Sequence, residues 1–327
     1  MLRHCLAFIR IAAMLTIYGL ITGNNAVAQP AGRTIRLIYA YPAGGGGDGL
    51  ARIIADRLQA RLGNPIIVEN RAGASGRIGT KAVIAAEPDG TTLLFTPLGP
   101  MSLHPLVYSN LDFDPFTDLA PISQIATFDT ALLVSHSLPV KNIGELIAWL
   151  KANPDKASYG TPGFGGLPHF FAVMFAASAK INLSSVPYRG GPAALNDLVA
   201  GQLPLAFLPT SDAVATSKSG GARAIATSGK IRSPMLSDVP TFRETGLPID
   251  GEGWYALYAP ARTPTDIISR ISTQLQEALQ EPSTRERLAA LGMVPTGTSP
   301  AELHNIQKVE QERWGPAIKA SGFKPSD

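Results

Sequence analysis

The chain has almost no cysteine: among its 327 residues there is one, Cys5, close to the N-terminus. A single cysteine forms no internal disulfide and cannot supply the paired thiols of a cysteine-based zinc site. Charged residues are also few, at 16% of the chain, and the formal net charge is only +3. Lys and Arg stand singly, without the basic stripe and interleaved aromatics that bind a phosphate backbone, so we expect no nucleic-acid partner.

Beyond its N-terminal segment the sequence has no apolar run of the roughly 18 residues that a membrane-spanning helix needs. Residues 1–28 combine a basic head, an apolar run from Ile11 to Ile21 and the small-x-small sequence Ala26-Val27-Ala28, which is typical of a signal peptide. We therefore expect export to the periplasm, with cleavage after Ala28. The remaining 299 residues carry 26 basic and 25 acidic side chains, and this length favours two lobes.

Glycine is abundant, and the first glycine-rich loop joins a strand to a helix. The loop runs from Ala43 to Asp48, and apolar residues then recur at helical spacing. This pattern predicts a helix over Gly49 to Leu62, with Asp48 as its N-cap and Gly63 just past its end. Because glycines at a helix N-terminus direct backbone N–H groups towards one spot, the loop predicts a pocket for an anion.

A second glycine-rich loop, from Gly160 to Gly166, also follows a strand and precedes an apolar helix, which we expect over Pro168 to Ala179. If the two loops face each other across a cleft, they can hold both ends of a small acid. Either loop taken alone could equally be a simple turn of the chain.

The first loop also matches the dinucleotide-binding pattern G-x-G-x-x-G at Gly44, Gly46 and Gly49, with Glu69 near the position of a ribose-binding acid. A run of four glycines matches such a pattern easily, and Asp48 would place a carboxylate beside the pyrophosphate. We therefore expect no cofactor.

Strand-like and helix-like segments alternate along the chain, which predicts an α/β fold with largely parallel sheets. The strand-like segments TALLVSHS and GWYALYAP bracket the second loop. We therefore place the first lobe at residues 29–125 plus 252–327 and the second at 126–251, so that the chain crosses between the lobes twice.

Several segments resemble the substrate-binding proteins of the tripartite tricarboxylate transporter group, the Bug family of periplasmic receptors. They include YPAGGGGDGLAR, VENRAGASG, ASYGTPGFGGLPHFF, VPYRGGPAALNDLVAGQ and GWYALYAPARTP, and together they span nearly all of the exported chain in the family's order. The resemblance implies a two-lobed, type II-like periplasmic-binding-protein fold. It also implies a monomer without catalytic residues, which captures a small organic carboxylate and delivers it to a membrane permease.

The resemblance carries the family's two ligand loops onto this chain. The ligand-binding residues that we expect are Tyr41, Ala43, Gly44, Gly45, Asp48, Thr96, Gly99, Thr161, Gly163, Phe164, Gly165, His169, Arg189 and Asp212. Thr96 and Gly99 could instead form a turn, Arg189 could lie on a lobe surface, and Asp212 could cap a helix.

Three positions depart from the family's pattern. Gly47 and Gly166 stand where the family commonly has a hydroxyl residue, and Phe164 stands where a small polar residue is frequent. These departures predict a roomier and more apolar pocket, suited to an aromatic or branched acid. The residues leave the ligand open among dicarboxylates, tricarboxylates, aromatic acids and amino acids.

Motifs for catalysis and for metal binding are lacking. There is no G-x-S-x-G elbow and no thiol after the expected cleavage site, and His104, His136 and His169 show no metal-ligand spacing. We expect neither an enzyme nor a bound metal. The alternative is an exported hydrolase or oxidoreductase that uses the glycine loops to hold an acidic substrate or a cofactor.

Overall fold

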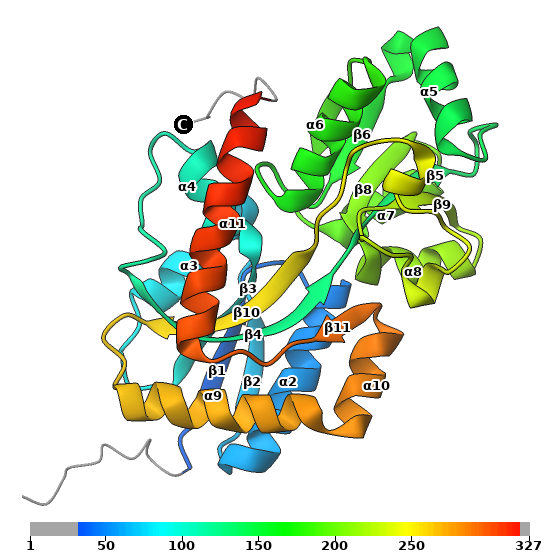
Figure 1. Ribbon diagram of the computed structural model, residues 1–327. Helices are drawn as coiled ribbons and strands as arrows, with labels where there is room; N and C mark the ends of the chain where they lie inside the picture. Colours follow the sequence, from blue (N-terminus) through cyan, green and yellow to red (C-terminus); the bar gives the residue numbers. More distant parts are fainter. Residues whose placement is uncertain (1–31, 321–327) are drawn as a thin grey trace, which may run out of the picture.

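The computed structural model describes residues 32–320, which form two β-sheets flanked by helices (Figure 1). The expected signal peptide and its cleavage site lie outside the described residues. Within the described part of the chain, no helix is both long enough and apolar enough to cross a bilayer.

The first sheet has six strands in the order β11-β4-β10-β3-β1-β2. Its strands are β1 (Ile35–Tyr39), β2 (Ile66–Asn70), β3 (Thr92–Pro97), β4 (Leu119–Phe128), β10 (Gly253–Pro260) and β11 (Met293–Pro295). The helices that accompany it are α2 (Gly46–Leu62), α3 (Arg77–Ile84), α4 (His104–Val107), α9 (Thr265–Gln280), α10 (Pro282–Ala290) and α11 (Pro300–Ala320).

The second sheet has five strands in the order β7-β6-β8-β5-β9 and forms the upper, green part of Figure 1. Its strands are β5 (Thr130–Ser135), β6 (Ser158–Thr161), β7 (Ser184–Pro187), β8 (Leu205–Pro209) and β9 (Ala222–Thr227). Its helices are α5 (Ile143–Ala152), α6 (Leu167–Ala179), α7 (Gly191–Val199) and α8 (Thr210–Lys218).

Both sheets are mixed, so the expectation of largely parallel sheets is wrong. β1 runs parallel to β2 and β3, and β6 runs parallel to β7 and β8. In contrast, β10 runs antiparallel to β3 and β4, and β5 runs antiparallel to β8 and β9. β5 is the strand by which the chain enters the second sheet, and β10 is the strand by which it returns to the first. Their direction is set by the connection between the sheets and not by a local βαβ crossover.

The chain passes between the sheets twice, as a two-lobed α/β fold requires. Only Asp129 separates β4 from β5, and the return leads through the segment before Gly253, where β10 begins. The predicted boundary after Ile125 therefore falls inside β4, three residues before that strand ends. That residues 126–251 form a separate lobe stays a prediction.

The strands at the centre of each sheet are apolar on both faces because helices cover both sides. Every residue of β8 and of β10 is buried. A large apolar cluster continues from α6 to α11, where the rings of Phe171 and Trp314 meet edge-on with centroids 5.6 Å apart. Phe170, Phe171 and Phe175 are buried in this core, as the apolar pattern of their helix predicts.

Candidate functional site

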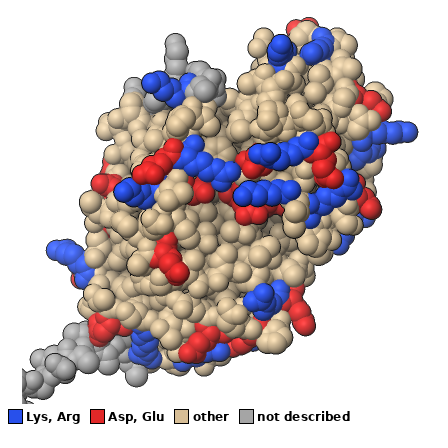
Figure 2. Space-filling model, viewed as in Figure 1, with Lys and Arg blue, Asp and Glu red and all other residues tan. Residues whose placement is uncertain are grey.

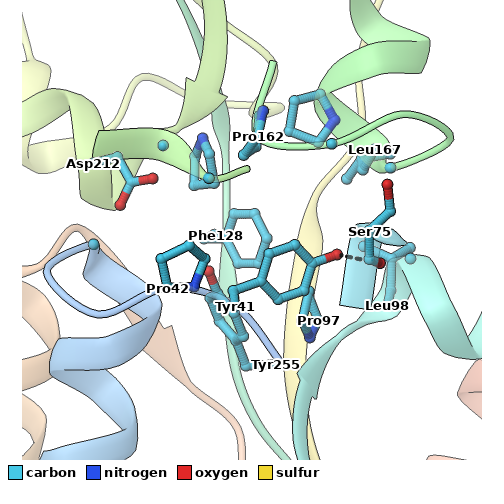
Figure 3. Close-up of a pocket in the computed structure, with 18 of the residues that line it drawn as sticks. Tyr41, Pro42, Ser75, Pro97, Leu98, Phe128, Pro162, Leu167, Asp212 and Tyr255 are labelled. Atoms are coloured by element: carbon cyan, nitrogen blue, oxygen red, sulfur yellow. Dashed lines mark hydrogen bonds between the residues drawn. The ribbon is translucent and has the colours of Figure 1, made fainter. Parts of the chain in front are cut away.

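A cavity lies at the seam between the two sheets, at the carboxyl ends of β1, β3, β6 and β8 (Figure 3). This edge is where ligands bind in open α/β sheets. The cavity has a volume of about 60 Å³, several times the roughly 10–15 Å³ that a single water needs. It therefore has room for several waters or a small organic molecule.

Proline, glycine and aromatic residues make up most of the cavity wall. The wall contains six prolines, namely Pro42, Pro97, Pro162, Pro168, Pro192 and Pro209. Because proline has no N–H, these positions offer rigid apolar surface and no hydrogen-bond donor. Six glycines, at Gly45, Gly99, Gly163, Gly166, Gly190 and Gly191, leave the backbone accessible between them. Backbone donors are thus confined to a few positions of an otherwise apolar wall.

The first glycine loop begins its helix earlier than the sequence predicts. α2 starts at Gly46 with Gly45 as N-cap, so Asp48 is the third helical residue and its prediction as N-cap is wrong. The buried Asp48 carboxylate instead accepts hydrogen bonds from the Gly44 N–H at 3.1 Å and from Asn70 Nδ2 at 2.9 Å. Burial alone would raise the pKa of Asp48, but hydrogen bonds from Asn70, Arg52 and Gly44 outweigh it and lower that pKa. Asp48 therefore stabilises the loop's conformation without lining the cavity.

Asp212 reaches across the seam from α8 and meets the start of α2. Its Oδ1 accepts the Gly46 N–H at 2.6 Å, although the two residues are 166 positions apart in the sequence. In Figure 3 the Asp212 carboxylate hangs from the second sheet's side towards the glycine loop below it. Burial raises the pKa of Asp212 to about 6, and the Gly46 hydrogen bond opposes this rise. Asp212 is the third residue of α8, so the alternative that it is the N-cap of a helix is wrong.

Two tyrosines lie beside this contact. The hydroxyls of Tyr39 and Tyr255 are hydrogen-bonded to each other, and burial raises the pKa of both phenols. A Cβ on Gly47 would overlap the Tyr39 hydroxyl and come within 2.8 Å of the Tyr255 hydroxyl. Gly47 therefore makes room for tyrosine hydroxyls and not for a larger ligand, which corrects that part of the roomy-pocket prediction.

The second glycine loop rests directly on the first sheet's side of the molecule. Gly165 has a φ of +71°, and a Cβ there would lie 2.7 Å from Val107 Cγ1. A Cβ on Gly163 would lie 3.1 Å from the Ser75 hydroxyl. The helix that follows, α6, has Gly166 as its N-cap, no side-chain cap and no acidic residue in its first turn. The sides of the cavity are thus in contact at both loops.

The predicted site residues divide into two groups. Those on the cavity wall are Tyr41, Gly45, Gly99, Gly163 and Asp212. The others lie away from that wall: Ala43, Gly44, Asp48, Thr96, Thr161, Phe164, Gly165, His169 and Arg189. Their roles in ligand binding stay predictions, and the structure gives most of them a different local contact.

The hydroxyls and rings of the second group turn inward. Thr96 and Thr161 are fully buried, and their hydroxyls donate to the carbonyls of Pro97 and Gly163. His169 is buried, and its Nδ1 lies 3.2 Å from the Tyr159 hydroxyl. Phe164 packs against the apolar core, with its ring centroid 4.7 Å from that of His169. The ring that we expected in the pocket is therefore not part of the cavity wall.

Arg189 is exposed and lines a separate hollow beside Tyr188 and Ser75. Gly44 lines an outer groove on the far side of Asp212, and Ala43 is exposed. Arg189 is not among the described residues that line the cavity, so its pairing with a ligand carboxylate stays a prediction.

Sequence reasoning missed Tyr39, Tyr255 and His104. Tyr39 ends β1, so its place at a strand's carboxyl end is a signal that could have revealed it. His104 is fully buried, neither ring nitrogen has a hydrogen-bond partner among the described residues, and burial lowers its pKa to about 3. Its Nε2 would lie 3.9 Å from a Cβ on Gly99, directly behind the cavity wall. Within residues 32–320 no group of three or more His, Cys, Asp or Glu side chains could hold a metal ion.

Two mixed α/β sheets joined by two crossings around a small cavity are the architecture of the periplasmic binding proteins to which this chain is similar. A family model described as the tripartite tricarboxylate transporter family receptor matches residues 50–323, and the chain belongs to this family. Protein BugT of Bordetella pertussis is 29% identical over 95% of this chain and 98% of its own.

Two solved structures share the fold throughout. The periplasmic binding protein BugD is 30% identical with a TM-score of 0.86, over 90% of this chain and 99% of that one. R. palustris Rpa4515 with adipate is 31% identical with a TM-score of 0.87, over the same shares of the two chains.

Proposed function

We propose that this protein is a periplasmic receptor that captures a small organic carboxylate between its lobes and delivers it to the permease of a tripartite tricarboxylate-type transporter. The cavity between the two glycine loops carries this proposal. The described residues of its wall include no Lys, Arg or His, so a ligand carboxylate would be held by backbone N–H groups and the helix dipole. The adipate bound to the related Rpa4515 supports a carboxylate as the ligand class.

The contacts across the seam support capture by closure. Glycine stands on one side of the close contacts at Gly46, Gly163 and Gly165, where a Cβ would, respectively, overlap the residue opposite, lie 3.1 Å from it and lie 2.7 Å from it. A ligand that touches both sides favours the closed form through its differential affinity for that form. Closure would then be the signal that the permease reads.

Thermal unfolding of the chain from Gln29 onward, with and without candidate acids, tests the receptor function. A ligand at a thousandfold its dissociation constant adds about 4 kcal/mol of stability, which gives a clear rise in Tm. The matched control is the uncharged amide of each acid. If no carboxylate raises Tm above its amide, the receptor function is wrong.

The enzyme alternative is separated from the receptor by turnover. A receptor returns the bound acid unchanged, whereas a hydrolase or oxidoreductase converts it or changes the absorbance of a reduced cofactor. Conversion of the acid by purified protein would favour the alternative.

Two further parts of the proposal concern the processing of the exported chain and its oligomeric state. We propose cleavage after Ala28, which the N-terminal mass of protein from a periplasmic extract would test. We further propose a monomer, which light scattering after gel filtration would test.

On the face shown in Figure 2, acidic and basic side chains stand side by side, so this face offers no continuous basic surface for a nucleic acid.

A further inference from the structure

Among the described residues, Asp212 is the one charged side chain on the wall of the cavity. It is partly exposed, and it also lines the outer groove beside Gly44, so it stands between the cavity and that groove. No basic side chain of the described wall balances its charge. A carboxylate in such a place favours a neighbouring positive charge and disfavours a negative one.

The carboxylate of Asp212 occupies the helix N-terminus that sequence reasoning reserved for a ligand. It accepts the Gly46 N–H at the first residue of α2. A Cβ on Gly45 would lie 3.0 Å from its Oδ1, and a Cβ on Gly191 would overlap its Oδ2. Glycines from both lobes thus leave a fitted space for this carboxylate between the first turns of α2 and α7. A ligand carboxylate at this position would have to displace it or lie beside it.

The second glycine loop lacks such a built-in acid. α6 begins after Gly166 without a side-chain cap and without an acidic residue in its first turn, and both Gly166 and Leu167 line the cavity. A ligand carboxylate therefore finds favourable electrostatics at α6, because the positive end of that helix dipole faces the cavity wall. The other end of such a ligand then faces Asp212.

The polar groups around Asp212 can accept hydrogen bonds from that other end. A carboxylate has about four acceptor sites, of which the Gly46 N–H uses one. The hydroxyls of Tyr39 and Tyr255 lie on the same wall and are joined to each other. An ammonium group there gains an ion pair and acceptors, whereas a second carboxylate meets a like charge.

We propose, on the basis of the receptor function above, that Asp212 selects zwitterionic amino acids, whose carboxylate binds at α6 and whose ammonium group binds at Asp212. Diacids of the same length are rejected by the same carboxylate. Asp212 is thereby the residue that determines specificity within a site whose other contacts are backbone and apolar.

Isosteric pairs of acids test this selection by titration calorimetry at pH 7.5. The pairs are adipate with 6-aminohexanoate, and succinate with 4-aminobutanoate, so that each pair differs mainly in the charge at one end. In the wild type we expect at least one amino acid to bind about tenfold or more tighter than its paired diacid, as close charge pairs at interfaces allow. Asp212→Asn keeps an oxygen that can accept the Gly46 N–H, and we expect it to remove or reverse this preference.

Asp238→Asn is the matched control, because Asp238 is an exposed acid that follows β9 and takes no part in the described cavity wall. It should keep the wild-type preference.

Asp212→Ser serves as a second variant if Asp212→Asn does not fold, as judged by its thermal transition. Equal preferences in the wild type and both variants would overturn the role of Asp212 and leave the receptor function standing. If none of the four probes binds but another carboxylate stabilises the protein, the selection is overturned alone. If no carboxylate binds the folded wild type, the receptor function falls with it.

Discussion

The two glycine loops are alike in sequence and different in the structure. Each follows a strand, contains several glycines and opens a helix, α2 in one case and α6 in the other. The first loop is held by two carboxylates, since Asp48 binds Gly44 from behind and Asp212 binds Gly46 from across the seam. The second loop has no acidic residue in its helix's first turn, and its Gly165 lies so close to Val107 that a Cβ there would come within 2.7 Å of Val107 Cγ1.

This difference teaches that a strand, a glycine run and a helix make a potential anion site, and that the rest of the fold decides whether the site remains available. The dipole and N–H groups of α2 and α6 are equivalent in kind. At α2 the protein supplies the anion itself, from a residue far along the chain. The asymmetry gives the cavity two chemically different ends, and the following changes should alter one end or the other.

The largest effect should come from Gly46→Ala. A Cβ at this position would overlap Ser211 of the opposite lobe, so the lobes could not close as they do here. If the competent closed form falls to about 1% of molecules, the apparent dissociation constant rises about 100-fold. Calorimetry should show this loss while Tm is kept, because alanine is favoured over glycine in a helix by about 0.5–1 kcal/mol.

Gly49→Ala is the control for that change, since it lies on the same helix and its Cβ would only touch Leu291 at 3.6 Å. It should bind as the wild type does. Unchanged binding by Gly46→Ala would mean that this side of the seam does not have to close.

A smaller effect is expected at the second loop from Gly165→Ala. The φ of +71° costs a non-glycine residue about 1–2 kcal/mol, and the new Cβ would press on Val107. Affinity should therefore fall by about tenfold. In a double-mutant cycle, Val107→Ala should restore part of the loss, and simple additivity of the two changes would rule out their contact as the cause.

The sequence predicted the repeated elements of this architecture well and their long-range partners poorly. The helix that it placed at Pro168 to Ala179 is α6, which begins one residue earlier and ends at Ala179, because proline is favoured in the first helical turn. Gly63 ends α2 in the left-handed conformation, as a glycine after a helical pattern indicates. Local rules were sufficient for these features.

The features that failed depend on contacts between distant segments. No residue near Gly47 in the sequence predicts that the hydroxyls of Tyr39 and Tyr255 fill the space beside it. Nothing near Gly46 indicates its contact with Asp212, which lies 166 positions further along the chain. The mixed strand directions likewise follow from the path between the sheets. Such facts appear only when both lobes are folded against each other.

Asp48→Asn should lower the free energy of unfolding by about 1–2 kcal/mol. The carboxylate of Asp48 accepts hydrogen bonds from the Gly44 N–H and from Asn70 Nδ2, whereas an asparagine amide has only one acceptor oxygen for these two donors. The pKa of Asp48 is lowered in the folded protein, so its contribution is present above its ordinary value of 3.8 and is lost as pH falls through the lower folded value. Urea unfolding should therefore separate the variant from the wild type at pH 7 and bring them together towards pH 3.

Asp56→Asn is the matched control on α2. Asp56 is exposed and forms only a surface ion pair with Arg287 at 3.5 Å, which contributes little to stability. A loss of stability as large as that of Asp48→Asn would show that the effect is general to acids on this helix.

The smallest effect, and the one of opposite sign, is expected for the stability of Asp212→Asn without ligand. Burial raises the folded pKa of Asp212 from 3.8 to about 6, so the folded protein disfavours the ionised form. The full shift corresponds to about 3 kcal/mol, which we reduce to about 1 kcal/mol because part of this side chain remains exposed to the cavity and the outer groove.

Asp212→Asn should therefore be more stable than the wild type at pH 7.5. Its advantage should shrink as pH falls through 6, because the wild type then gains a proton that its folded state favours, and should vanish below about 3.8, where both states are protonated. Asp129, whose pKa burial and then Glu252 raise to about 7, titrates in both proteins and cancels in the difference. The measurement is the free energy of unfolding in urea at several pH values for both proteins. A variant that is less stable than the wild type at pH 7.5 would mean that the Gly46 hydrogen bond outweighs the buried charge, and the two carboxylates at the first loop would then act alike.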